Sequence, residues 1–258
     1  MSPVEQNPYA YGTGFARSAA QVDQGLRSFM LGVYNNMVLG LGVSALVALG
    51  INMAATSSTP TPVRIGSVYL TEFGRLLYGT PLMWVVALAP LAFIFFFTFR
   101  MDRMSAASAR TTFLAFAAVM GASLSTLLIR YTGASVVQVF FITAAAFGAL
   151  SLWGYTTKRS LSGFGSFLVM GLIGLLLASL VNIFLASSAL QFAISCIGVL
   201  IFAGLTAYDT QKLKEMYVYG NFDGEAAAKV SIFGALTLYL DFINMFQFLL
   251  ALVGNRNE

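Results

Sequence analysis

The sequence contains no histidine, and this absence removes several classes of functional site. Imidazole is the usual general base of serine and cysteine catalysis and a common ligand of zinc. The only cysteine, Cys196, cannot form a disulfide within the chain, and the apolar stretch around it indicates a small buried side chain. We therefore expect a protein that is not an enzyme and that holds no resident cofactor.

Charged residues are also scarce, at 9% of the 258 residues, while 58% of the residues are hydrophobic. Soluble domains average about 25% charged and roughly 45–50% apolar residues. A globular domain of this length cannot bury so much apolar surface, so soluble enzymes, nucleic-acid-binding proteins and disordered proteins are excluded. Loop charges that orient a membrane protein explain the net charge of +4 better than binding to nucleic acid does. The composition predicts an all-α polytopic protein of the lipid bilayer.

Seven stretches are apolar and long enough to cross a bilayer, which takes roughly 20 residues. They cover residues 29–55, 82–99, 111–130, 135–154, 165–186, 189–211 and 232–253. We expect a cytoplasmic segment at 1–28 that lacks the apolar core of a signal peptide, a seven-helix domain at 29–253, and a short tail at 254–258. The turns after spans three and five are so short that each should join an antiparallel helix hairpin.

The loops differ in positive charge, which predicts the orientation of the chain. Loops on the same side of the membrane as the N-terminus carry ten Lys and Arg residues, and loops on the opposite side carry four. Positively charged loops stay in the cytoplasm. We therefore expect the N-terminus in the cytoplasm and, after seven crossings of the cell (inner) membrane, the C-terminus outside. The longest outer loop, 56–81, is expected to hold a short interfacial helix at Tyr69–Tyr78.

Small residues recur within two of the spans at spacings that place them on one helix face. They are Ala117, Gly121 and Ser125 in span three, and Gly171, Gly174 and Ala178 in span five. Small side chains let neighbouring membrane helices approach closely, so we expect tight helix packing at both stripes.

Two acidic residues, Asp209 and Asp241, lie inside the apolar spans. An ionisable side chain there costs several kcal/mol unless it is paired or hydrated, so such residues are functional candidates. Asp241 belongs to a stripe of small and polar residues that share one helix face. The stripe consists of Ser231, Gly234, Thr237, Asp241 and Asn244. We expect it to face the interior of the bundle, with Thr237 and Asn244 supporting the acid.

Spans six and seven are consecutive and antiparallel, so Asp209 and Asp241 are able to meet. Asp241 is farther from the nearest loop lysine, and the two depths match best if span seven begins as a helix outside the membrane. Two carboxylates in contact cannot both ionise without a large cost, and they titrate as one unit. We interpret the pair as a pH sensor and gate. Carboxylate oxygens also suit Ca²⁺, so the pair is a candidate metal site, and structural hydrogen bonding is the alternative.

Arg100 ends span two on the cytoplasmic side, at the level expected for Asp209. We interpret it as an ion-pair candidate that competes with Asp241 for Asp209. The alternative is an ordinary anchor whose guanidinium extends to the lipid headgroups.

Three separate motifs resemble the Bax inhibitor-1 (transmembrane Bax-inhibitor-motif) family. They are the stretch from Ile142 to Phe184, the AYDTQKLK of Ala207–Lys214 and the LYLDFINMF of Leu238–Phe246. The similarity runs from about Asn35 to Phe248. It implies a seven-helix fold with the last helix central, and a pH-sensitive calcium leak sensed by aspartates on helices six and seven. Asp209 and Asp241 are the matching positions, and an arginine of helix two would fall on Arg100.

The chain departs from that pattern in two places. Thirty-one residues separate Asp209 from Asp241, several more than in eukaryotic relatives, and the tail lacks the lysine-rich end of animal members. An anti-apoptotic role is therefore not carried over, and the short tail is typical of bacterial members. Those relatives include a modulator of the FtsH membrane protease.

Two functions remain open, and a third is disfavoured. The first is a monomeric calcium or cation leak channel gated by protonation, and the second is a non-transporting regulator that binds a membrane protease such as FtsH. An intramembrane aspartyl protease would carry Gly-x-Gly-Asp at its second acid, but this chain has Leu238-Tyr239-Leu240-Asp241. Without those glycines an extended substrate has no space beside the acid.

Overall fold

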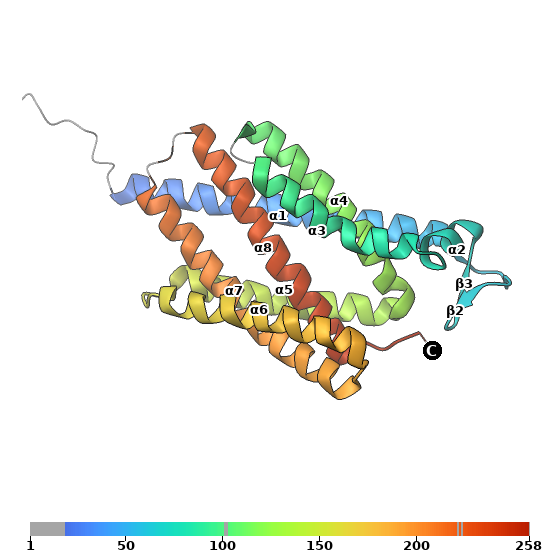
Figure 1. Cartoon of the computed structure of the whole chain (residues 1–258). Coiled ribbons are helices and arrows are strands. Elements are labelled where there is room, and N and C mark those ends of the chain that lie inside the picture. The colour runs from blue at the N-terminus through green and yellow to red at the C-terminus, as the bar shows by residue number, and fades with distance from the viewer. Residues whose placement is uncertain (1–18, 101–102, 221, 223, 258) are drawn as a thin grey trace, which may run out of the picture.

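The computed structural model describes residues 19–100, 103–220, 222 and 224–257, and these form a helical bundle with a small sheet at one end (Figure 1). Most of the expected N-terminal segment at 1–28 and the last residue of the tail lie outside the described residues. The long helices are α1 (Ala19–Ala55), α3 (Leu82–Arg100), α4 (Ala106–Arg130), α5 (Gly133–Thr156), α6 (Ser162–Leu185), α7 (Ser188–Tyr219) and α8 (Gly224–Val253). Each expected span is therefore helical.

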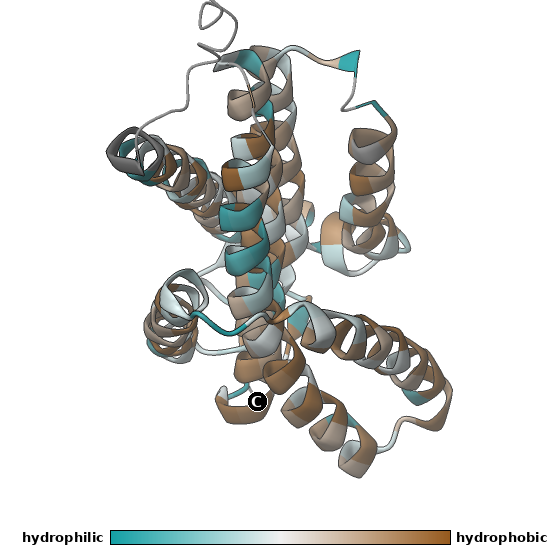
Figure 2. Ribbon diagram, turned by 90° about the vertical axis from the view of Figure 1, so that its left-hand side faces the viewer, coloured by the Kyte–Doolittle hydropathy of each residue, from teal (hydrophilic) through white to brown (hydrophobic). Residues whose placement is uncertain are grey.

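Six of these helices are long and apolar enough to cross a membrane by themselves. The remaining one, α3, forms a bent pair with the short helix α2 (Glu72–Tyr78), and the two axes differ by 62°. The pair is either one broken span or a re-entrant segment, so the described chain has six candidate spans, or seven if the pair crosses. Figure 2 shows brown, hydrophobic residues along these helices.

Polar side chains cap the first turns of three helices. Ser105, Thr132 and Ser187 each accept a hydrogen bond from the backbone N–H three residues later, which satisfies a donor that the helix start leaves free. At the end of α6, Ala186 adopts a left-handed conformation with φ of 48°, and Asn182 Oδ1 accepts a hydrogen bond from the Ser187 N–H. This pair closes the turn into α7.

Of the two expected antiparallel hairpins, the α6–α7 hairpin is present and the α4–α5 hairpin is not. Helices α6 and α7 pack against each other after their short turn. By contrast, α4 packs mainly on α1, whereas α5 turns away after Tyr131 and Thr132 and packs on α7 and α8. Figure 1 shows α4 and α5 diverging from their common turn. The apolar faces of α7 and α8 offer α5 a larger partner surface than α4 does, and two turn residues leave the angle between the helices open.

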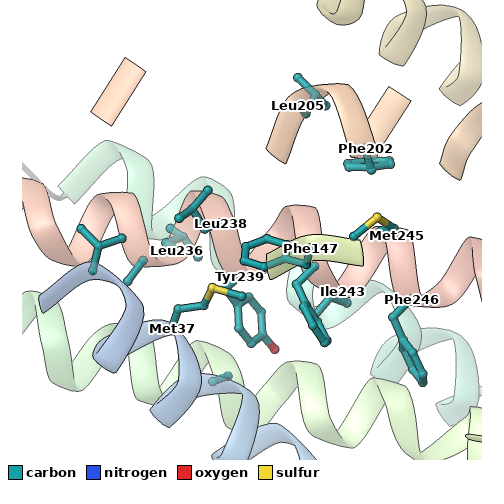
Figure 3. Close-up of a cluster of buried hydrophobic side chains, with 14 of the residues drawn as sticks. Met37, Phe147, Phe202, Leu205, Leu236, Leu238, Tyr239, Ile243, Met245 and Phe246 are labelled. Atoms are coloured by element: carbon teal, nitrogen blue, oxygen red, sulfur yellow. The ribbon is translucent and has the colours of Figure 1, made fainter. Parts of the chain in front are cut away.

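Helix α8 is in contact with α1, α4, α5 and α7. Half of its most apolar window is buried, against 17% for α6. Its side chains therefore form much of the core, including the fully buried Leu238 and Tyr239 (Figure 3). Leu250 of the same helix is also fully buried. The core also includes Phe147 of α5 and Met37 of α1, which Figure 3 shows beside α8.

The small residues of α4 produce the expected close approach of two backbones. A methyl group on Gly121 would lie 2.5 Å from the carbonyl oxygen of Ser44, so α1 and α4 touch there. Ala117 and Ser125 are fully buried on the same face. The stripe of α6 is only partly used, because Gly171 meets Ile201 of α7 while Gly174 has open space beside it.

A three-stranded sheet, which the sequence did not predict, occupies the loop between α1 and α2. Its strands are β1 (Thr56–Ser57), β2 (Arg64–Ile65) and β3 (Val68–Leu70), in the order β1-β3-β2. Gly66 makes the turn between β2 and β3 with φ of 58°, which glycine adopts without strain. A short helix is present in the expected region as α2, which Thr71 caps, but it begins at Glu72 because Tyr69 and Leu70 belong to β3.

The two ends of the described chain lie at opposite ends of the bundle. Phe29 near the start of α1 stacks on Tyr217 near the end of α7, with ring centroids 4.9 Å apart. At the other end, the tail is bonded to the α4–α5 turn, where the Thr132 N–H donates to the Asn255 carbonyl and the Asn257 N–H donates to the Arg130 carbonyl. Figure 1 shows the sheet and the C-terminus at this second end.

Candidate functional site

The two intramembrane aspartates meet where α7 and α8 pack together. Their carboxyl groups lie close enough to interact electrostatically and to share a hydrogen bond. Asp241 is 4% exposed, and Asp209 is half-buried. Two carboxyl groups can share a hydrogen bond only if one of them holds the proton. The structure therefore brings together the two acids that the sequence singled out, in an arrangement that is able to hold one proton between them.

The helix lengths explain how two residues of different depth can meet. Helix α7 continues past Lys214 to Tyr219, and α8 begins at Gly224, well before the apolar span at 232–253. The expected early start of span seven is thus present, and the extension of α7 accompanies it. Gly234 lets α7 approach closely, since a methyl group there would lie 2.7 Å from the Leu213 side chain.

One oxygen of the pair has no partner. Within the described part of the chain, Asp241 Oδ2 is buried and accepts no hydrogen bond. A buried polar atom without a partner is costly, and such atoms are concentrated at functional sites. This oxygen is therefore the atom of the pair that is best placed to receive a proton or a cation.

A resident Ca²⁺ site would need more oxygen ligands than the pair supplies. Calcium takes 6–8 oxygens, commonly with several carboxylates. Among the described residues, no group of three or more acids, cysteines or histidines gathers at one point. Two carboxyl groups fit brief coordination of a passing cation better than permanent binding.

Thr237 and Asn244 lie on the same helix as Asp241 but bond to their own backbone. The Thr237 hydroxyl donates to the Phe233 carbonyl at 3.1 Å, and Asn244 Nδ2 donates to the Leu240 carbonyl at 2.8 Å. The carbonyl oxygen of the Asn244 side chain is left available. Asn244 also lines a cavity of about 300 Å³ at the C-terminal end of the bundle, together with Gln247.

The structure does not pair Arg100 with Asp209. Helix α3 packs on α4 and α2, and the exposed Arg100 guanidinium lies over the Phe96 ring at 5.5 Å. Among the described residues, Glu72 and Arg75 form the one ion pair within 4.0 Å. The cation that acts on Asp209 is instead Lys212, one helical turn further along α7. That i,i+3 spacing is readable from the sequence.

A chain of hydroxyl groups from α1 and α5 ends at Thr210, the residue that follows Asp209. Tyr34 Oη lies 2.6 Å from Ser151 Oγ, which lies 2.9 Å from Thr210 Oγ1. Thr210 donates in turn to the carbonyl of Thr206 at 2.7 Å. These residues come from α1, α5 and α7, so no local pattern in the sequence indicates them.

A second buried hydroxyl contact fixes α8 against α1 and α4. Tyr239 Oη lies 2.6 Å from Ser44 Oγ, and Ser44 donates to the Ala117 carbonyl at 2.7 Å. The ring of Tyr239 packs edge-on against Phe113 and Phe116 of α4. Tyr239 is two residues before Asp241, so this contact holds the backbone of the acid in place.

Comparison with known proteins assigns the chain to a family. The family model described as "Inhibitor of apoptosis-promoting Bax1" matches residues 26–258. The chain belongs to the Bax inhibitor-1 family. The match confirms the resemblance that the three sequence motifs indicated, and it extends that resemblance to the tail.

Bacterial relatives of the Bax inhibitor-1 family align over nearly the whole chain. A protein of Caulobacter vibrioides is 49% identical over 254 residues, covering 96% of this chain and 99% of the relative. The inner membrane protein YbhL of Escherichia coli K12 is 44% identical over 241 residues, covering 93% of this chain and 96% of the relative. A protein of Rickettsia prowazekii is 43% identical over 236 residues, covering 92% of this chain and 93% of the relative.

Proposed function

We propose that this Bax inhibitor-1 family protein is a calcium leak channel of the inner membrane whose flux depends on pH. The contact between Asp209 and the buried Asp241 is the observation that carries the proposal. A carboxyl pair inside a membrane bundle is a costly arrangement, and its cost is explained by a role in moving or sensing cations.

Loss of the shared proton is the proposed switch. With one proton present, a hydrogen bond joins α7 to α8 at the pair. When the proton leaves, two negative charges face each other in the interior, and they repel unless a cation or water separates them. Calcium is a suitable counter-ion because it favours carboxylate oxygens. Here it is the transported substrate, and no resident cofactor is proposed.

A polar route on the C-terminal side of the pair supports a leak. Asn244 lies about one helical turn beyond Asp241, or roughly 5 Å along α8. It opens on the 300 Å³ cavity, which Gln191, Arg130 and Arg256 also line. Asn244, Gln191 and Gln247 supply amide groups to this cavity, and the two arginines add positive charge that a cation would meet there.

We propose that this channel has seven spans with α8 in the centre of the bundle, the N-terminus in the cytoplasm and the C-terminus outside. This topology is supported by the excess of positive loop charge on one side, the contacts of α8 with four other helices, and the position of the two chain ends at opposite ends of the bundle. Reporter fusions should place Ala20 and Phe222 in the cytoplasm and Gly66 outside. A cytoplasmic reporter at the C-terminus would leave six spans and make α2–α3 re-entrant.

A non-transporting regulator of a membrane protease such as FtsH is the alternative. Docking to a protease requires an exposed surface but no carboxyl pair in the bundle interior. The position of Asp241 therefore favours the leak.

Calcium flux into liposomes, measured as a function of pH, tests the proposal. Monomeric wild-type protein should conduct with a pH midpoint, and Asp241→Asn should remove the pH dependence. Glu215→Gln, which removes another carboxyl of α7, is the matched control and should keep the midpoint. A wild-type protein that inserts and folds but carries no calcium at any pH would reject the channel in favour of the regulator.

A further inference from the structure

A groove runs along the outside of the bundle between α1 and α5. It consists of two adjoining cavities of about 850 and 440 Å³, which share the lining residues Leu41, Ala45, Phe140 and Phe242. Helix α1 packs mainly on α4 and α8, and α5 packs on α7 and α8, so the groove lies where α4 and α5 diverge. The bond between Tyr34 and Ser151 joins its two walls.

The groove is polar at one end and apolar along the rest. Asp23, Arg27 and Tyr155 lie at the end where α1 begins. Beyond Tyr34 the groove is lined by aliphatic and aromatic side chains. Ser44 is the exception, and its hydroxyl group is already hydrogen-bonded to Tyr239 Oη and to the Ala117 carbonyl. Such a gradient matches a molecule with one polar end and a long apolar body.

The charge at the polar end is positive. Arg27 is exposed, and no carboxylate of the described chain lies within ion-pair distance of it. Lys214 adds a second cation, because its ammonium donates to the Tyr155 carbonyl at 2.9 Å and lies over the Tyr155 ring. Arg27 and Asp23 are the charged residues that line the groove itself, so one positive charge remains in excess at this end when Lys214 beside Tyr155 is included.

The length of the groove fits one leaflet of a bilayer. From Arg27 to Leu41 is fourteen residues of α1, or about 21 Å at 1.5 Å per residue. Half of a bilayer, including headgroups, is roughly 20–22 Å. We propose that this groove binds one anionic phospholipid, with its phosphate at Arg27 and Lys214 and its acyl chain along the α1–α5 walls toward Leu41 and Phe140.

One glycine of the groove, Gly148, can be replaced by a larger residue without disturbing the bundle. Gly148 lines the groove, and nothing lies within 4 Å of the position that a methyl group would take there. Gly174 of α6 has equally open surroundings and lines none of the principal cavities, so it is the matched control. Gly148→Leu should block the acyl chain, whereas Gly174→Leu should not.

The test uses full-length protein in liposomes of phosphatidylcholine that contain phosphatidylglycerol, followed by native mass spectrometry. Wild type and Gly174→Leu should retain one phosphatidylglycerol in preference to phosphatidylcholine. Gly148→Leu should retain about tenfold less of it, which is about 1.4 kcal/mol. Arg27→Gln should lose the preference for phosphatidylglycerol but still retain a lipid, while Lys158→Gln, at an exposed loop lysine, should behave as wild type.

Photo-crosslinking with a phosphatidylglycerol that carries a diazirine in its acyl chain gives a second measurement. Labels should fall on the α1 and α5 residues that line the groove, and Gly148→Leu should remove them. Equal retention of both lipids by wild type would overturn the proposal, as would full retention by a folded Gly148→Leu. Cross-links through the groove to a second copy of the chain would also overturn it.

Discussion

The carboxyl groups of Asp209 and Asp241 face each other across the α7–α8 interface, close enough to share a hydrogen bond, and Asp241 is almost completely buried. Such a bond would need a proton on one of the two carboxyl groups, and this proton is the one that the proposed function assigns to the pH response. Lys212 of α7 acts electrostatically on Asp209, whereas the buried oxygen Oδ2 of Asp241 has no hydrogen-bond partner among the described residues. The following predictions concern this interface and the contacts that hold it.

Asp209→Asn and Asp241→Asn should each abolish the pH dependence of calcium flux, and the double variant should add little. Residues that titrate as a unit have non-additive effects. Flux into liposomes at several pH values measures this, with Glu215→Gln as the control. Independent, additive effects of the two substitutions would reject the shared proton.

Arg100→Gln should shift the pH midpoint of flux upward by about one unit, which corresponds to roughly 1.4 kcal/mol. In the structure Asp209 lies next to Asp241, and Arg100 lies over Phe96. We expect Asp209 to exchange Asp241 for Arg100 when the proton leaves, because arginine stays charged throughout. Removing the guanidinium then disfavours the deprotonated state. Arg103→Gln is the control, and an unchanged midpoint in Arg100→Gln would make Arg100 a headgroup anchor.

Arg256→Gln should raise calcium flux about 2- to 5-fold, as expected for loss of an exposed charge worth about 0.5–1 kcal/mol. Arg256 lines the polar cavity that Asn244 opens on, so its charge repels a cation there. The backbone pairing of Arg256 with Tyr131 does not depend on the guanidinium. Arg64→Gln, on strand β2 at the same end of the bundle, should leave the flux unchanged. A flux equal to that of wild type would place the cation route elsewhere.

Tyr239→Phe should lower the free energy of unfolding in detergent by about 0.5–1.5 kcal/mol, the usual net contribution of one hydrogen bond. The loss stays small because Ser44 keeps its bond to the Ala117 carbonyl, so no donor is left unpaired. Thermal or denaturant unfolding of the purified protein measures it. A loss above about 3 kcal/mol would mean that the hydroxyl supports more than the Ser44 contact.

Gly121→Ala should destabilise the protein by about 1–3 kcal/mol, the usual cost of overpacking. Its methyl group would lie 2.5 Å from the Ser44 carbonyl oxygen, which is backbone and cannot rotate away. Gly50→Ala is the matched control, since Gly50 is a helical glycine with open space beside it. We expect Gly50→Ala to be neutral or stabilising, because alanine favours helix. Equal effects of the two substitutions would show that α1 and α4 separate easily at Gly121.

The sequence by itself determined the class of protein and the position of its helices. Apolar runs bounded by charged and turn residues predict spans because each backbone polar group in a bilayer must be bonded within its own helix. The same reasoning selects Asp209 and Asp241, since acids are rare and costly inside such runs. The small stripe around Gly121 likewise indicates a contact face, although it does not name the partner helix.

Only the tertiary structure decided which helices meet. The path of α5 away from α4, the hydroxyl chain from Tyr34 to Thr210 and the bond between Tyr239 and Ser44 all join residues distant in sequence. The same holds for Arg100, which the sequence placed at the depth of Asp209 and which the structure places on Phe96. Hydropathy reports how deep a residue lies along its helix. The direction in which its side chain points around the helix axis, and the residues that it meets, depend on how all side chains pack together. No local pattern contains that information.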